Sequence, residues 1–268
     1  MSVLTSPEIK PIHRNFNFFL TLVCYASLIA GIYLGTAQDY FYILCVFAFI
    51  SINQQAFLHR LAVHRSWDCP NWMKIIGLHI SVLALMGPVI VWVAIHREHH
   101  RQSDTEKDPH SPLFRSGFSI QFLYGWTKFN YLNAGDLLRK KIYRFYSVRY
   151  FEVILVTWCV IMYVIGVEKF FTVWLAGTAL SFISTNSVNV LNHGKRFWFG
   201  QYRNYDTRPD ISKNDILLGY LHFDGWHNNH HQYPRHYYFG KKWWELDFAG
   251  MYIWILATIT GYNSSLKK

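Results

Sequence analysis

The chain has 268 residues, of which 51% are hydrophobic, 19% aromatic and only 16% charged. Soluble domains carry about 25% charged residues, so this composition indicates a membrane-embedded domain rather than a soluble one. The net charge of +10 does not indicate nucleic-acid binding, because basic and aromatic residues do not interleave as they do in nucleic-acid-binding modules. The four cysteines lie far apart and contain no C-x-x-C pair, so they indicate neither a disulfide framework nor a cysteine-ligated metal site.

Two long uncharged segments predict a first transmembrane hairpin. Residues 15–38 form a run of 24 uncharged residues, and residues 40–59 form a second run of 20. At a rise of about 1.5 Å per residue, each run is long enough to cross about 30 Å of hydrocarbon. We therefore expect two spanning helices joined at Asp39. No small-residue cleavage site follows the first run, so we do not expect a removable signal peptide.

A second hairpin is predicted by the apolar runs 151–167 and 170–192, which flank Glu168 and Lys169. The apolar run 75–95 is also long enough to span, but a crossing there would separate the histidines on its two sides by about 30 Å. We therefore expect this run to be interfacial or re-entrant, with a break at Gly87 and Pro88.

The basic residues support this topology. Of the 26 lysines and arginines, 25 fall on one side of a four-span arrangement, and Lys169 alone falls on the other side. Because basic residues gather on the cytoplasmic side of membrane proteins, both termini should be cytoplasmic. Aromatic residues in the apolar run near the C-terminus, within 241–262, indicate an interfacial helix rather than a fifth span.

Eight histidines fall into three clusters, which are His59 with His64, then His96, His99 and His100, and then His227, His230 and His231. The last two clusters have the spacing i, i+3, i+4, which places three imidazoles on one face of a helix. Imidazole binds zinc, copper, iron and nickel, so the histidines alone leave the metal open. Eight ligands are too many for one ion at ordinary coordination numbers, and we therefore predict two metal ions.

These motifs resemble those of a known family. HRLAVHR begins at His59, HREHHRQSDTEKDPH at His96 and GWHNNHHQYPRH at Gly225. In their order and spacing, the chain resembles the membrane fatty-acyl desaturases of the delta-9 type, and more closely their bacterial members. The resemblance covers the whole chain as one domain, residues 1–268. The expected fold is an all-α integral membrane protein with four transmembrane helices in two hairpins, interfacial helices and a cytosolic cap that carries the dimetal site.

The resemblance implies a set of site residues. Nine histidines would bind a di-iron centre, and Asn189 would reach one iron through a water molecule. The histidines are His59, His64, His96, His99, His100, His193, His227, His230 and His231. Asp104 and Asp108 could orient ligand imidazoles, although a capping role or a solvated loop is an equal alternative. Trp92 could line a substrate tunnel or be an ordinary packing residue. The remaining histidines, which are His13, His79, His110, His222 and His236, lack the cluster spacing and are expected to be structural.

The resemblance implies an O2-dependent enzyme that introduces a cis double bond at carbon 9 of a saturated acyl chain. The acyl chain would be carried on coenzyme A or on a lipid. Animal acyl-CoA members have an Arg-Asp pair where this chain has Ala94 and Ile95, which puts coenzyme A recognition in doubt. The sequence contains no haem, iron–sulfur or dinucleotide-binding motif, so electrons should come from a separate ferredoxin or cytochrome b5. The expected location is the bacterial inner membrane, with the endoplasmic reticulum as an alternative.

Two other functions remain open from the residues. A di-iron membrane hydroxylase of lipids, sterols, carotenoids or alkanes would use the same oxidant, and only the resemblance separates it from a desaturase. A histidine-rich metal transporter is the alternative from another class. A transporter would need ionisable residues at the bilayer midplane, whereas this chain concentrates them at one end of its spans.

Overall fold

A computed structural model describes residues 11–123 and 130–268, and nearly all of its regular structure is helical. Helix α1 (Pro11–Leu34) and helix α2 (Ala37–Asn53) occupy the region of the first predicted hairpin. The hairpin turns at Gly35 and Thr36, so the prediction of a turn at Asp39 was wrong by a few residues. Thr36 is the N-cap of α2, and its backbone N–H donates to the Asp39 carboxylate at 2.9 Å. Asp39 is therefore part of a capping box inside the first turn of α2.

The second helix of this hairpin continues past its predicted end as the π-helical segment η1 (Gln54–Val63). The next segment is divided into α3 (Asn71–Val82) and α4 (Val89–Gln102), and a turn that contains Gly87 and Pro88 separates the two helices. Gly87 has a φ of 103°, which a residue with a side chain rarely adopts. The predicted break in the run 75–95 is thus confirmed.

The region of the second predicted hairpin consists of α8 (Tyr150–Ile165) and a continuous helical segment made of α9 (Val167–Lys169), η3 (Phe170–Leu175) and α10 (Ala176–Asn192). Glycines allow this segment to approach the first hairpin closely. A Cβ atom on Gly31 would lie 2.4 Å from the carbonyl oxygen of Thr172, and one on Gly177 would lie 2.6 Å from the Cβ of Val46. Small residues at such contacts are typical of packed membrane helices.

The remaining elements are short. Before α8 lie α5 (Gly117–Leu123), η2 (Tyr131–Ala134), α6 (Gly135–Leu138) and α7 (Lys141–Val148). After α10 lie β1 (Gln201–Tyr202), β2 (Asn214–Asp215), α11 (Ile216–Leu221), α12 (His227–Gln232), α13 (Phe248–Thr260) and η4 (Asn263–Ser265). The two strands pair antiparallel, with Gln201 opposite Asp215.

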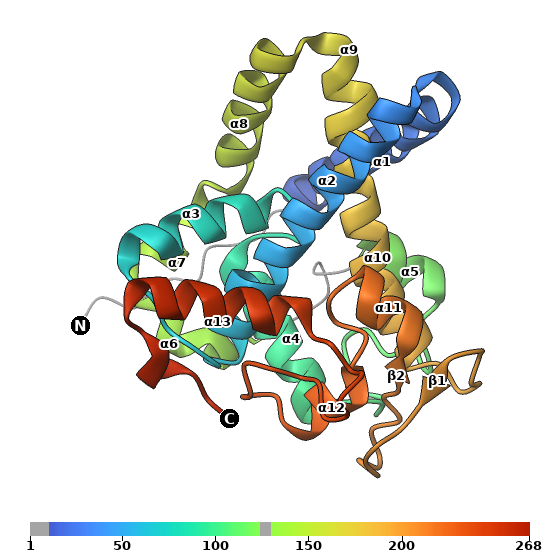
Figure 1. The fold of residues 1–268 in the computed structure, drawn as a ribbon, viewed down its shortest axis with the longest axis vertical. Helices are drawn as coiled ribbons and strands as arrows, with labels where there is room; N and C mark the ends of the chain where they lie inside the picture. Colours follow the sequence, from blue (N-terminus) through green and yellow to red (C-terminus); the bar gives the residue numbers. More distant parts are fainter. Residues whose placement is uncertain (1–10, 124–129) are drawn as a thin grey trace.

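The long apolar helices extend toward one end of the molecule, whereas α4, α12 and the strands occupy the other end (Figure 1). One core joins the helices, because Leu20 of α1, Phe57 of η1, Leu78 of α3, Ile90 of α4 and Ile154 of α8 are all buried in the same cluster. The histidine-bearing elements are therefore held against the base of the apolar helices.

Two helices are long and apolar enough to cross a membrane, namely Arg14–Leu34 with 21 residues and Ala37–Val63 with 27. Helix α7 and helix α8 make a third such segment if the pair, bent by 73°, counts as one span. Helix α13 has 13 residues, which at about 1.5 Å per residue is too short to span. Length and composition thus support a helical membrane protein. They identify two spans, or three with the bent pair, and the predicted four spans are more than these helices provide.

Candidate metal centre

Four structural elements bring the nine predicted histidines to one place. η1 carries His59 and ends at His64, α4 carries the second cluster, His193 caps α10, and α12 carries the third cluster. The backbone N–H of His64 donates to the carbonyl of His59 at 3.2 Å, which is an i to i+5 bond. The wider π-helical turn places residues five apart on one face. This geometry explains how a pair without α-helical spacing joins the other clusters.

Five of the histidines converge in a first set, the five-histidine group, which consists of His59, His64, His96, His100 and His230. Four of their Nε2 atoms form a ring in which successive separations are 3.1 Å from His59 to His230, 3.0 Å to His100, 3.2 Å to His96 and 3.0 Å back to His59. The centre of a square ring of this size lies about 2.2 Å from each nitrogen, close to the 2.0–2.1 Å of metal–imidazole bonds. The ring therefore has the dimensions of a metal site.

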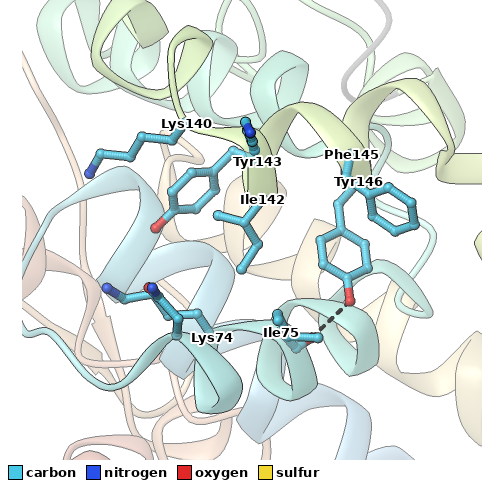
Figure 2. Close-up of a pocket in the computed structure, with 9 residues that line it drawn as sticks. Lys74, Ile75, Lys140, Ile142, Tyr143, Phe145 and Tyr146 are labelled. Carbon is cyan, nitrogen blue, oxygen red and sulfur yellow. Dashed lines mark hydrogen bonds between the residues drawn. The ribbon is translucent and has the colours of Figure 1, made fainter.

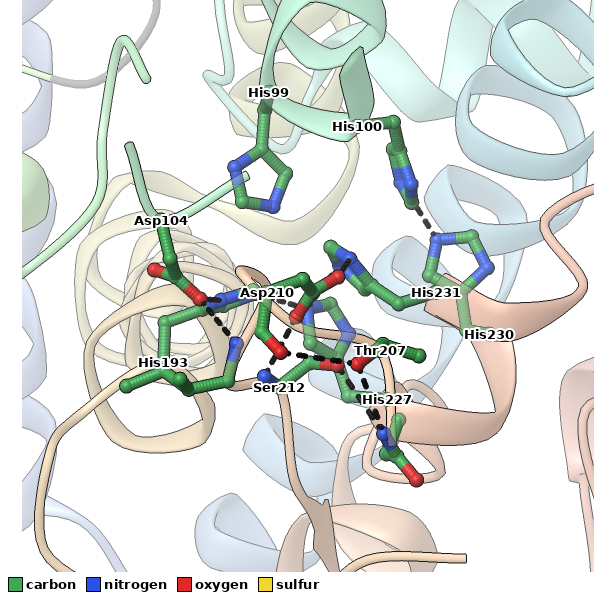
Figure 3. A network of polar contacts seen from close by, with 12 residues as sticks. His99, His100, Asp104, His193, Thr207, Asp210, Ser212, His227, His230 and His231 are labelled. Atoms are coloured by element: carbon green, nitrogen blue, oxygen red, sulfur yellow. Dashed lines mark hydrogen bonds and ion pairs between the residues drawn. The ribbon is translucent and has the colours of Figure 1, made fainter. Parts of the chain in front are cut away.

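The other four histidines form the four-histidine group, His99, His193, His227 and His231. The Nε2 atom of His227 lies 3.0 Å from that of His193 and 3.1 Å from that of His231. The ligand atoms of this group all lie within 4.8 Å of one another. The rings of His100 and His231 stack at 4.3 Å, so the two groups are neighbours (Figure 3).

Carboxylates hold the outer nitrogens of the four-histidine group (Figure 3). In three of its histidines, the Nδ1 atom contacts the carboxylate of a buried aspartate. The distances are 2.9 Å from His99 to Asp108, 2.7 Å from His193 to Asp104 and 2.6 Å from His231 to Asp210. Such contacts fix the ring orientation and leave Nε2 available to a metal. The orienting role predicted for Asp104 and Asp108 thus agrees with their contacts, whereas Asp210 was missed because no sequence signal connects it to His231.

The five-histidine group is supported differently. The Nδ1 atom of His59 contacts the Gln55 amide oxygen at 2.6 Å, and the Trp92 indole stacks on His96 with ring centroids 4.8 Å apart. Trp92 is therefore in contact with the site. Asp224 is buried between the groups, with a carboxylate oxygen 3.8 Å from Nδ1 of both His59 and His227.

Burial favours the neutral imidazoles that a metal requires. Desolvation lowers the pKa of His100 to about 4, and desolvation followed by repulsion from His59 holds the pKa of His230 well below its ordinary value. His193 is the exception: burial is the largest influence and acts to lower its pKa, but the combined effect of the surrounding carboxylates, Asp104 first and then Asp210 and Asp108, raises this pKa above its ordinary value. Neutral nitrogens can bind a metal ion without first releasing a proton.

The donor set fits a pair of metal ions. Imidazole lone pairs that face one another at about 3 Å repel unless a proton or a cation lies between them. In addition, Nε2 of His64 and Nε2 of His99 are buried, and neither has a hydrogen-bond partner among residues 11–123 and 130–268. One such nitrogen belongs to each group. A cation within each group would satisfy these atoms.

The other predicted residues have varied surroundings. Asn189 is buried in α10, four residues before His193. His79 contacts the Thr157 hydroxyl at 2.9 Å, and His222 contacts the Ser184 hydroxyl at 2.8 Å. Both contacts agree with a structural role. The side chain of His13 lies outside the described residues.

His110 is closer to the site than its spacing indicated. Its ring lies 4.1 Å from that of His99, and His99, Asp108 and His110 form a further group that could hold a metal. His110 therefore contacts the site, although its spacing in the sequence predicted only a structural role. It follows Asp108 by two residues, and its backbone N–H donates to Asp108 at 3.0 Å, so this tight turn brings it to the site.

Comparison with known proteins gives a consistent result. A sequence model described as fatty acid desaturase matches residues 37–254. The chain is 32% identical to delta-9 acyl-lipid desaturase 2 of Arabidopsis thaliana over 222 residues, which are 78% of this chain and 68% of the relative. It is 32% identical to the sn-1 stearoyl-lipid 9-desaturase of Anabaena variabilis over 217 residues, 78% and 76% of the two chains. An acyl-CoA 5-desaturase of Anemone leveillei is 31% identical over 240 residues, which cover 86% of this chain but only 65% of that relative, less than two thirds of its length.

Proposed function

The chain belongs to the fatty acid desaturase family of oxidoreductases, and on this premise we propose that it introduces a cis double bond at carbon 9 of a saturated fatty-acyl chain. The observation that carries the proposal is the division of nine histidines into two adjacent groups at the base of apolar helices. In the proposed reaction, the acyl chain, O2, two electrons and two protons give the alkene and two molecules of water. The two hydrogens leave neighbouring carbons of the same chain.

The two groups of histidines would hold two iron ions, and Asn189 would contact one of them through water. Bound iron would supply the activation of O2 and the oxidising power that removal of hydrogen from an alkyl chain requires. The protein's own contribution is to keep the imidazoles neutral by burial and to fix their orientation. Asp104, Asp108 and Asp210 serve the second purpose in the four-histidine group.

The acyl carrier is proposed to be a membrane lipid or coenzyme A. Ala94 and Ile95 are both buried, with 0% and 1% of their surfaces exposed, so neither can contact a soluble head group at the surface. The named relatives include both acyl-lipid and acyl-CoA desaturases. The apolar helices would hold the hydrocarbon chain straight or bent in a fixed register, so that only one pair of carbons reaches the metal centre.

Electrons would come from a separate protein. The net charge of +10 would attract an acidic ferredoxin or cytochrome b5 to the basic side of the membrane domain. We propose four spans with both termini on the cytoplasmic side, as the distribution of 25 of 26 basic residues indicates. A reporter inserted between Glu168 and Lys169 should then be accessible from outside, and one placed within residues 104–108 should not.

Deuterium labelling tests the reaction and its position together. Purified protein loaded with iron receives O2, a ferredoxin reduction system and octadecanoyl chains that carry two deuterium atoms on carbon 9 and two on carbon 10. Desaturation at this position gives a monounsaturated product that has lost one deuterium from each carbon. Retention of all four atoms would place the double bond elsewhere, and parallel assays with coenzyme A and with a glycerolipid identify the carrier.

A further inference from the structure

A cavity of about 640 Å³ lies between α3 and α7 (Figure 2), and its lining contains none of the nine histidines of the candidate metal centre. Its lining combines lysines with apolar side chains. The lysines are Lys74, Lys140 and Lys141, and the apolar residues include Ile75, Ile142 and Phe145. In Figure 2, Lys140 from the α7 side and Lys74 from α3 reach toward the same end of the cavity. The cavity therefore has a basic end and an apolar interior.

The walls of this cavity are fixed by a contact between its two helices. The Tyr146 hydroxyl of α7 donates to the carbonyl oxygen of Ile75 in α3 at 2.9 Å. Tyr143 is buried beside it, with only 3% of its surface exposed. The Tyr146 hydrogen bond thus joins α7 to α3 across the cavity, and the burial of Tyr143 and Tyr146 anchors α7 in the core.

The charge at the basic end is only partly neutralised within the protein. Lys74 forms an ion pair with Asp68 at 2.5 Å, and the Asp68 side chain is itself 58% exposed. Lys140 and Lys141 are exposed, and neither forms an ion pair with another residue in the part of the chain that the structure describes. The ammonium groups of Lys140 and Lys141 therefore remain available to an anion at the cavity that both residues line.

The surroundings of the cavity have the composition of a membrane interface. Helix α7 bends by 73° into the apolar helix α8, so it lies across the base of that helix rather than along it. Next to the cavity, the apolar residues Trp72, Ile76 and Phe145 each expose between 52% and 58% of their surfaces. Exposed tryptophan beside lysine is characteristic of the membrane interface, where lysine side chains extend toward the aqueous phase.

We propose that this cavity binds the phosphate group of an anionic glycerophospholipid. The phosphate is bound by Lys140 and Lys141 with Lys74 adjacent, and the acyl chains of the lipid cover the exposed surfaces of Trp72, Ile76 and Phe145. A phosphate with an attached hydrocarbon matches the two-part character of the site better than a soluble anion does. The assignment goes beyond the proposed function, because the cavity contains no residue of the metal centre.

Lipid binding can be measured without enzyme activity. Delipidated full-length protein in a neutral detergent is titrated with phosphatidylglycerol or with phosphatidylcholine, and bound lipid is counted by native mass spectrometry. We expect phosphatidylglycerol to bind, and the double variant Lys140→Ala and Lys141→Ala to weaken its binding at least about 10-fold, given that a basic residue near a membrane surface contributes about 1 kcal/mol. Phosphatidylcholine should bind more weakly and be insensitive to this variant.

Two further variants separate a specific site from general charge and from misfolding. Lys140→Arg with Lys141→Arg should retain binding, because the charge is kept. Arg115→Ala with Lys195→Ala, which removes two exposed charges outside the cavity, should also retain it. Equal loss of binding in this control, or equal binding in all variants, would overturn the proposal. Displacement of the lipid by free coenzyme A or inorganic phosphate at the same concentration would assign the cavity to a soluble phosphate and would also overturn it.

Discussion

The imidazoles of the four-histidine group differ from those of the five-histidine group in the partners of their outer nitrogen. Three carboxylates contact Nδ1 atoms in the former, whereas a neutral amide contacts His59 in the latter. A carboxylate makes an imidazole a stronger donor than an amide does. The metal ion in the four-histidine group should therefore be the one whose affinity depends on acidic residues.

Replacing Asp210 by asparagine tests this dependence. The change keeps the size of the side chain but removes the charge that contacts Nδ1 of His231 at 2.6 Å. We expect a 10- to 100-fold lower affinity for one metal ion per chain, because loss of an outer-shell partner has about this effect. Equilibrium dialysis against iron measures it. Asp206→Asn is the matched control, since Asp206 pairs with the exposed Arg208 instead, and equal losses in both variants would contradict the assignment.

The division into two groups predicts how metal content responds to single substitutions. Because His227 belongs only to the four-histidine group and His230 only to the five-histidine group, His227→Ala and His230→Ala should each lose about one metal ion, and the double variant should lose both. Elemental analysis of the purified proteins gives the counts. His236→Ala should retain the wild-type content, because His236 contacts Lys241 and lies outside both groups. A wild type with one metal ion per chain would contradict the two-site arrangement.

At the scale of elements, an ion pair connects the π-helical segment with the C-terminal part of the chain. Arg60 of η1 donates to both carboxylate oxygens of Asp247, at 2.6 and 2.9 Å, and both side chains are fully buried. Asp247 is also the N-cap of α13. The Arg60 guanidinium lies 3.8 Å above the Phe239 ring, which in turn lies 4.3 Å from His230. This ion pair thus holds η1, α13 and the Phe239 segment against the metal centre.

Replacing Asp247 by alanine should destabilise the protein strongly. The change leaves the buried Arg60 charge without its carboxylate and removes the cap of α13, which together cost about 3–5 kcal/mol. We expect the melting temperature in detergent to fall by roughly 10 °C, as followed by circular dichroism. The comparison is Asp206→Ala, which breaks a surface ion pair and should shift the melting temperature little. A similar shift of the melting temperature in the two variants would contradict a larger stabilising contribution from the buried ion pair than from the surface ion pair.

Local sequence patterns predicted which histidines come together wherever the helix is regular. The spacing i, i+3, i+4 in α4 and α12 correctly indicated imidazoles on one face. The pair His59 and His64 was harder to interpret, because its geometry requires a π-helical turn that leaves no simple sequence signal. Asp210 and Gln55 could not be identified, since Asp210 reaches its histidine through a loop and Gln55 resembles any polar residue at a helix end.

The predicted helix boundaries agree with the structure near α8 and differ from it near α2. Helix α8 ends at Gly166, which has a φ of 82°, two residues before the charged pair Glu168 and Lys169 at which the sequence predicted a turn. The turn before α2 lies earlier than expected. Thr36 caps the N-terminus of α2, so the helix begins before Asp39. The position of this turn therefore follows the capping residue Thr36 rather than the charged residue Asp39.

At the scale of the whole molecule, the apolar helices are joined at one end to the elements that carry the two groups of histidines (Figure 1). In the proposed topology, this arrangement would bring the candidate metal site next to the hydrocarbon region of a membrane, where saturated acyl chains are abundant. A hydroxylase would share the same architecture, because the same oxidant can either insert oxygen or remove a second hydrogen. The product distinguishes the two functions.

The central claim is tested most directly by expressing the chain with a competent ferredoxin system in a host that lacks desaturase activity. Total fatty acids are then analysed by gas chromatography with mass spectrometry, which separates alkenes from alcohols by mass. We predict new cis monounsaturated chains of 16 or 18 carbons with the double bond at carbon 9, and their disappearance in the His227→Ala variant. Hydroxylated chains without new alkene, or alkene that persists in His227→Ala, would contradict the proposed desaturase.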